Sequence, residues 1–220
     1  MRSERGVALL MAMMAMVLMS GLGLALVATT SSETMIAANF RASVEMSYAA
    51  DAMAERAITD LRSVTDWTDV LNGSVRSSFV DGAPDGTRTL ADGAAIDLGK
   101  ILNLANCNKS TPCSAANMTA VTAERPWGAN NPRWQLYGYG QLDHVLPSAA
   151  GASDVYAIAM VGDDPSEGDG NPLSDTSDEH QPGAGILAVR VEVFGPRSAH
   201  RIVELTLTHQ PELRVLSWRP

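Results

Sequence analysis

Closely spaced carboxylates are the residues of this 220-residue chain whose types and spacing could most readily do chemistry. Seven acids lie in one glycine-containing segment: Asp163, Asp164, Glu167, Asp169, Asp175, Asp178 and Glu179. Oxygen ligands on a chain that can turn sharply are what Ca²⁺ prefers, although the spacing is not that of an EF-hand loop. We predict an acidic loop over residues 163–180. It is either a solvated polar loop or a Ca²⁺ site with Asp163, Asp164, Asp169 and Asp175 as ligands.

The two cysteines are the second candidate for chemistry. Cys107 and Cys113 enclose five residues. They can form a disulfide if this part of the chain lies outside the cytoplasm. Zinc is the alternative, but two cysteines without a nearby histidine pair make a poor zinc site. We therefore predict that a Cys107–Cys113 disulfide pins one loop.

Catalytic signatures are missing from the sequence. It contains no Gly-x-Ser-x-Gly, His-Glu-x-x-His or phosphate-loop motif. The net charge of −9 with only two lysines argues against a generally basic nucleic-acid surface. We expect a protein that is not an enzyme, with no cofactor apart from the Ca²⁺ alternative.

An uncharged segment near the N-terminus determines on which side of a membrane the acids and cysteines would lie. Residues 7–28 carry no charge, and Arg2 and Arg5 precede them. Twenty-two helical residues span about 33 Å, enough to cross a hydrocarbon core of roughly 30 Å. The arginines favour a cytoplasmic N-terminus with the bulk of the chain outside. A cleaved signal peptide is the alternative, but this run is longer than a usual signal core and Ala25–Ala28 offers only a poor cleavage site.

The helical pattern continues past the uncharged run. Residues 32–62 contain no proline or glycine. Apolar residues recur at three- and four-residue spacing: Met46, Ala49, Ala50, Met53, Ala57 and Leu61. This spacing predicts one buried helix face. Nothing forces a break between Val7 and Arg62, so the sequence favours one helix about 84 Å long.

Turn signals and alternating strands follow the helix. Asn-Gly and Asp-Gly pairs between residues 63 and 133 indicate loops with short extended pieces. Alternation near 134–139, an apolar run over 155–161, and two alternating segments over 189–193 and 201–207 predict strands, the last two forming a hairpin. We therefore expect an α+β fold, with a long N-terminal helix packed on a C-terminal antiparallel β-sheet head.

A short basic leader that ends in Gly6, with a hydrophobic helix directly after it, resembles the type IV pilins and pseudopilins. Within that family, residues 1–62 are most similar to the minor pilins of the PilX type. The similarity comprises Arg5-Gly6-Val7-Ala8-Leu9-Leu10, the segment Met35–Arg41, and Ala49-Ala50-Asp51-Ala52. Major pilins carry a glutamate at the fifth mature position, where this chain has Met11. The departure argues against a major subunit and is compatible with a minor one.

The resemblance implies a pilin-like architecture and a life cycle. Residues 1–6 would be a leader that a prepilin peptidase removes between Gly6 and Val7, with methylation of the new N-terminus. Residues 7–30 would form the transmembrane and filament-core helix, residues 31–62 its amphipathic continuation, and residues 63–220 the globular head. The chain would be a single-pass protein of the bacterial inner membrane with the head outside, later joining other pilins in a pilus (fimbrium) during pilus assembly or at its tip. The alternative is a membrane-anchored extracytoplasmic binding protein, Ca²⁺-dependent or not, that does not polymerise.

Overall fold

The computed structural model describes residues 5–90, 92–145, 154–175, 180, 182–209 and 212–219. By its internal contacts the chain divides into two compact units, residues 1–44 and residues 45–220. We describe each unit by itself and refer to the second as the head.

The described part of the first unit, residues 5–44, is one helix. Helix α1 runs without a break from Arg5 to Leu61, so its last seventeen residues belong to the head. The run of hydroxyl residues after the apolar segment does not interrupt it. The hydroxyls of Thr29, Thr30, Ser32 and Thr34 donate to carbonyls three or four residues earlier at 2.8–3.1 Å. These bonds let polar side chains stay in a helix without competing for its own amide groups. The predicted continuous helix is confirmed.

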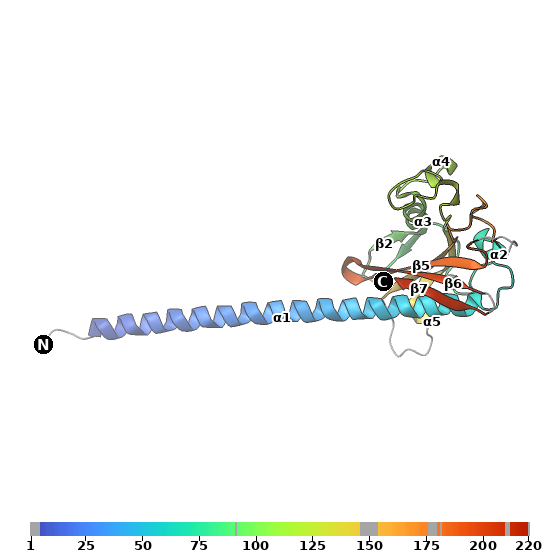
Figure 1. Ribbon diagram of the computed structural model, residues 1–220. Coiled ribbons are helices and arrows are strands. Elements are labelled where there is room, and N and C mark those ends of the chain that lie inside the picture. Colours follow the sequence, from blue (N-terminus) through green and yellow to red (C-terminus); the bar gives the residue numbers. More distant parts are fainter. Residues whose placement is uncertain are drawn as a thin grey trace. The chain divides into compact units, whose positions relative to one another are not determined.

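A five-stranded antiparallel sheet forms the centre of the head (Figure 1). Its strands pair in chain order: β3 (Gln135–Gln141), β4 (Tyr156–Asp163), β5 (Ile186–Gly195), β6 (Ala199–Thr208) and β7 (Arg214–Arg219). The hairpin of β5 and β6 turns through a short 3-10 segment, Pro196–Ser198. The predicted hairpin and the strand at 155–161 are confirmed.

The inner face of the sheet packs on the last turns of α1. Alternate residues of β4, β5 and β6 point to this face and are buried: Ala157, Ala159, Val161, Val189, Val191, Val193, Val203, Leu205 and Leu207. The helix contributes the apolar face that the sequence predicts, now with Ala54 and Ile58 added. Burial of both sets of side chains is the main source of head stability. The α+β fold is therefore confirmed.

Two glycines allow the helix to approach the sheet closely. A Cβ on Gly138 of β3 would lie 3.0 Å from Met53 Cε and 3.1 Å from Ser77 Cβ. A Cβ on Gly195 at the end of β5 would lie 2.7 Å from Met46 Sδ. The distance at Gly195 is too short for a real side chain, and those at Gly138 are tighter than ordinary contacts, so the methionines of α1 occupy space that glycine leaves open.

A second layer covers part of the outer face. It contains the small hairpin of β1 (Thr87–Thr89) and β2 (Ala95–Asp97), α3 (Leu98–Cys107), α4 (Ala115–Met118) and a 3-10 turn (Gly128–Asn130). Helix α2 (Thr68–Leu71) instead contributes Val70 and Leu71 to the core that α1 forms with the inner face. Leu98 and Ile101 of α3 pack on the outer residues Tyr156, Ile158 and Met160 of β4. A short helix, α5 (Leu142–Val145), follows β3. The sequence did not predict α3, and it missed β7.

Candidate functional site

The exposed apolar part of α1 is the first feature that bears on function. Every large apolar side chain from Val7 to Val27 is at least 59% exposed. This helix is the one described segment that is long and apolar enough to cross a membrane, by length and composition. Such a surface needs lipid or other helices to cover it, since exposed contiguous apolar area is unfavourable in water. Single-pass membrane anchoring is therefore compatible with the structure.

The predicted processing site lies at the start of this helix. Gly6 and Val7 are both helical and exposed, and no atom lies within 4 Å of a Cβ built on Gly6. The rest of the predicted leader, residues 1–4, lies outside the described residues. Cleavage between Gly6 and Val7 remains a prediction.

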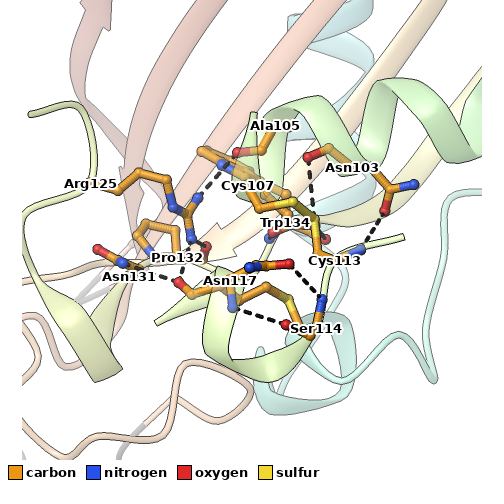
Figure 2. Close-up of a disulfide and its surroundings, with 12 residues drawn as sticks. Asn103, Ala105, Cys107, Cys113, Ser114, Asn117, Arg125, Asn131, Pro132 and Trp134 are labelled. Carbon is orange, nitrogen blue, oxygen red and sulfur yellow. Dashed lines mark hydrogen bonds between the residues drawn. A yellow bond between two sulfur atoms is a disulfide. The ribbon is translucent and has the colours of Figure 1, made fainter. Parts of the chain in front are cut away.

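The predicted disulfide is confirmed. Cys107 and Cys113 are bonded, with their Cα atoms 6.1 Å apart (Figure 2). Cys107 is the last residue of α3, and Asn108 ends that helix in a left-handed conformation (φ 55°) that turns the chain back. The backbone amide of Cys113 donates to the Asn103 side chain. The disulfide therefore links the segment after α3 covalently to the end of that helix.

Polar side chains fix the rest of this layer to the sheet. The Asn106 amide donates to the carbonyl of Trp134 at 3.0 Å and accepts from the Trp134 amide at 2.8 Å. Arg125 donates to the carbonyls of Ala105, Met118 and Pro132 at 3.1, 3.3 and 2.7 Å (Figure 2). Burial lowers the pKa of Arg125, yet the three carbonyls hold its guanidinium in place. Hydrogen bonds between side chains and backbone, rather than an apolar pattern, thus position this layer.

A groove of about 710 Å³ lies between this layer and the outer face of β5–β7. Two cross-strand rows of side chains line it on the sheet side. One row is Ala188, Thr206 and Ser217, and the other is Arg190, Glu204 and Arg219. Ser217 donates to Thr206 at 2.9 Å, and Arg190 pairs with Glu204 at 2.7 Å. Leu104, Arg125 and Trp127 line the groove from the opposite side. Its volume is in the range of small-ligand sites.

A charged network continues from this row along β5. Arg190 also pairs with the buried carboxylate of Glu192 at 2.8 Å, and His200 Nε2 lies 3.0 Å from the other oxygen of that carboxylate. Burial alone would raise the pKa of Glu192, but the His200 hydrogen bond and the Arg190 charge outweigh it and lower the pKa. Glu192 is therefore ionised and paired at neutral pH, as a buried charge must be.

The structure brings only part of the acidic segment into the protein. Asp163 ends β4 and is 4% exposed, and the nearby Glu167 is 1% exposed. Burial, together with the charge of Glu167, raises the pKa of Asp163 to about 8. Asp175 is partly buried, accepts from the Gly185 amide at 2.8 Å, and has a raised pKa through burial. The burial of Glu167 has no signal in the sequence, because it depends on the return of the chain at Gly183.

The two other predicted Ca²⁺ ligands, Asp164 and Asp169, accept hydrogen bonds from residues two positions further along the chain. Asp164 accepts from the amide and hydroxyl of Ser166 at 2.7 and 2.6 Å, and Asp169 accepts from the Asn171 amide at 2.7 Å. Within the described residues no group of three or more metal-ligating side chains is gathered. Asp178 and Glu179 lie outside the described residues. The Ca²⁺ site therefore stays a prediction.

Comparison with known proteins gives no identification: no protein-family model, curated protein or solved structure matches the chain.

Proposed function

We propose that the chain is a minor subunit of a type IV pilus or a related filament, with a structural rather than a catalytic role. One observation carries the proposal. A single helix has an apolar first part that is exposed on all sides and a last part that belongs to the core of an α+β head. A simple anchor needs about 20 apolar residues and can be joined to its domain by a flexible linker. A helix that is continuous with the head core is what a filament needs to link buried helices to exposed heads.

The helix surface suits association with other helices. Small side chains at Ala8, Ala12, Ala15, Ser20 and Gly21 alternate with flexible methionines. Small residues let helix backbones approach closely in an apolar environment, and methionine adapts its shape to neighbours. The partners we propose are other pilins, after processing by a prepilin peptidase at the inner membrane. The head would lie outside the cytoplasm, where the Cys107–Cys113 disulfide is stable.

N-terminal processing tests this proposal directly. Intact mass or N-terminal sequencing of protein from its native host should show a chain that starts at Val7. A Gly6→Val variant should retain the leader, whereas Gly21→Val should be processed normally. The pair is matched, because no atom lies within 4 Å of a Cβ built on either glycine. A native chain that keeps Met1, or one cut near Ala28, contradicts the proposal.

A membrane-anchored binding protein that does not polymerise is the second candidate. The groove of about 710 Å³ favours it, since such a volume can hold a small ligand. The same measurement separates the two functions, because a simple anchor has no reason to lose residues 1–6. Sheared surface filaments give a second readout. They should contain the chain if it is a pilus subunit and lack it if it is only anchored.

A further inference from the structure

The two edges of the five-stranded sheet differ in how they are covered. Residues 77–81 lie against the edge of β3. The amides of Ser77 and Asp81 donate to the carbonyls of Tyr137 and Tyr139 at 2.9 and 3.2 Å, and the Tyr139 amide donates to Phe79 at 2.8 Å. An isolated parallel bridge joins Val80 to Tyr139. This edge is therefore closed by the chain itself.

The edge at β7 is open. In the described part of the chain, β7 pairs with β6 alone, and no segment hydrogen-bonds to its other side. An open edge presents unpaired backbone amides and carbonyls, which are a template for another strand. Three apolar side chains of β7 are also exposed, Val215 by 44%, Leu216 by 54% and Trp218 by 37%.

The register of β7 assigns its side chains to the two faces of the sheet. Val215 lies opposite Leu207 and Trp218 opposite Leu205, so both are on the inner face. Arg214, Ser217 and Arg219 lie opposite Thr208, Thr206 and Glu204 and are on the outer face. The irregularity between Thr206 and Leu207 leaves Leu216 as the extra residue of a bulge. The bulge is the reason that both arginines point to the same face, although five positions separate them.

Charge decides which kind of strand fits this edge. The chain carries a net charge of −9, yet the open edge has an arginine at each end, and neither arginine forms an ion pair with another described residue. Antiparallel pairing with a second copy of β7 over its full length would oppose Arg214 of one copy to Arg219 of the other. Like charges directly opposite one another destabilise strand pairs, whereas opposite charges stabilise them.

We propose that β7 binds an extended acidic segment of another protein by β-strand addition. Five positions of a regular antiparallel strand would face Arg219, Trp218, Ser217, Val215 and Arg214. The complementary pattern is therefore acid, apolar, small polar, apolar, acid. Ser217 and Arg219 also line the groove, so outward side chains of the added strand have open space there. This inference does not rest on the filament assignment.

The test uses the full chain in detergent and a labelled peptide with the core Glu-Val-Thr-Val-Glu. We expect saturable binding by fluorescence anisotropy. A peptide with lysine in place of both glutamates should bind about tenfold more weakly, because two cross-strand pairs change from attractive to repulsive. A third peptide, N-methylated at all five core residues, should show no saturable binding, because strand addition uses backbone amides that methylation removes.

Charge reversal in the protein separates recognition from misfolding. The Arg214→Glu/Arg219→Glu variant should lose about tenfold in affinity for the glutamate peptide and gain about the same for the lysine peptide. The control Arg62→Glu/Lys100→Glu makes the same change in net charge at two other exposed positions of the head. It should leave both affinities unchanged.

Four results would overturn the proposal. They are no saturable binding of the glutamate peptide, equal binding of the N-methylated peptide, an equal loss in the control variant, and no gain for the lysine peptide after charge reversal. Sedimentation of the full chain adds a fifth. Self-association that Arg214→Glu/Arg219→Glu abolishes would mean that the edge serves a second copy instead.

Discussion

Met53 offers the sharpest test of the contact between helix and sheet in the head. Its side chain is fully buried, and its Cε fills the space beside Gly138 of β3. The Met53→Ala substitution removes this side chain beyond Cβ and leaves a cavity between two rigid elements. Neither the helix backbone nor the sheet can collapse fully into such a cavity, so the packing lost is not regained.

The expected loss of stability is large compared with the total. Truncation of a buried methionine to alanine costs about 2–5 kcal/mol of folding stability. A domain of this size is stable by only about 5–15 kcal/mol. At about 2–4 °C per kcal/mol for 150–250 residues, the melting temperature should fall by about 4–20 °C. Tryptophan emission is a suitable readout, because all four tryptophans, Trp67, Trp127, Trp134 and Trp218, lie in the head.

Two further variants make the measurement specific. Met14→Ala changes the same residue type in the same helix, but Met14 is 59% exposed and lies outside the head. Its head should melt like the unchanged protein. Gly138→Ala alone should destabilise the head, because the new methyl would lie 3.0 Å from Met53 Cε. In the Met53→Ala background that clash is gone, so the double variant should lose less than the sum of the single ones.

One outcome would refute this reasoning outright. If Met53→Ala and Met14→Ala leave the same melting temperature, the last turns of α1 do not belong to the head core. Strict additivity of Met53→Ala and Gly138→Ala would be a narrower failure. It would mean that the two residues are not in contact in solution, even if the helix is buried.

The remaining predictions concern the loops. Thiol labelling of the native protein should modify neither Cys107 nor Cys113 before reduction, and the double serine variant should lose stability at the low end of about 2–4 kcal/mol, since the closed loop is short. Asp163 keeps its proton in the folded state up to a pKa of about 8 but ionises near 3.8 when unfolded, so stability should fall as pH rises from about 4 to 8 and then level off. Asp163→Asn should flatten that slope, and an unchanged slope would show that other groups cause it. If the acidic segment binds Ca²⁺, saturating Ca²⁺ should raise the melting temperature more above pH 8, where Asp163 is ionised, than at pH 6, and no rise at either pH would leave a solvated loop.

Periodicity accounts for the parts of the fold that the sequence predicts well. The buried face from Met46 to Leu61 follows helical spacing, and the β5–β6 hairpin follows strict alternation on either side of Gly195-Pro196. Helix α3 escaped notice because it is only ten residues long and contains a glycine at its second position. Strand β7 escaped because its bulge at Leu216 interrupts the alternation that marks a strand.

The candidate sites follow a different logic. The disulfide could be predicted because two cysteines six positions apart have few other partners in a chain with no further cysteine. The groove could not be predicted from the sequence, because Asn106 and Arg125 hold its covering layer through hydrogen bonds to backbone carbonyls far apart in sequence. Such bonds leave no periodic trace. The burial of Asp163 is likewise a tertiary effect: the buried Glu167 lies close enough for its charge to raise the pKa of Asp163, and the chain returns beside Glu167 at Gly183.

The methionines of α1 have different surroundings in the two parts of this helix. Met46 and Met53 sit in spaces that Gly195 and Gly138 leave open, so their shapes are fixed by the sheet. Met11, Met13, Met14, Met16 and Met19 have no such partner in the described residues and are all at least 59% exposed. A flexible thioether tolerates many neighbours, which would suit this segment if, as proposed, it contacts lipid before assembly and other helices afterwards. The same residue type thus specifies a unique contact in the head, while the exposed segment needs only an apolar and adaptable surface. Substitutions in the two parts should therefore affect different properties, folding in the first case and insertion or assembly in the second.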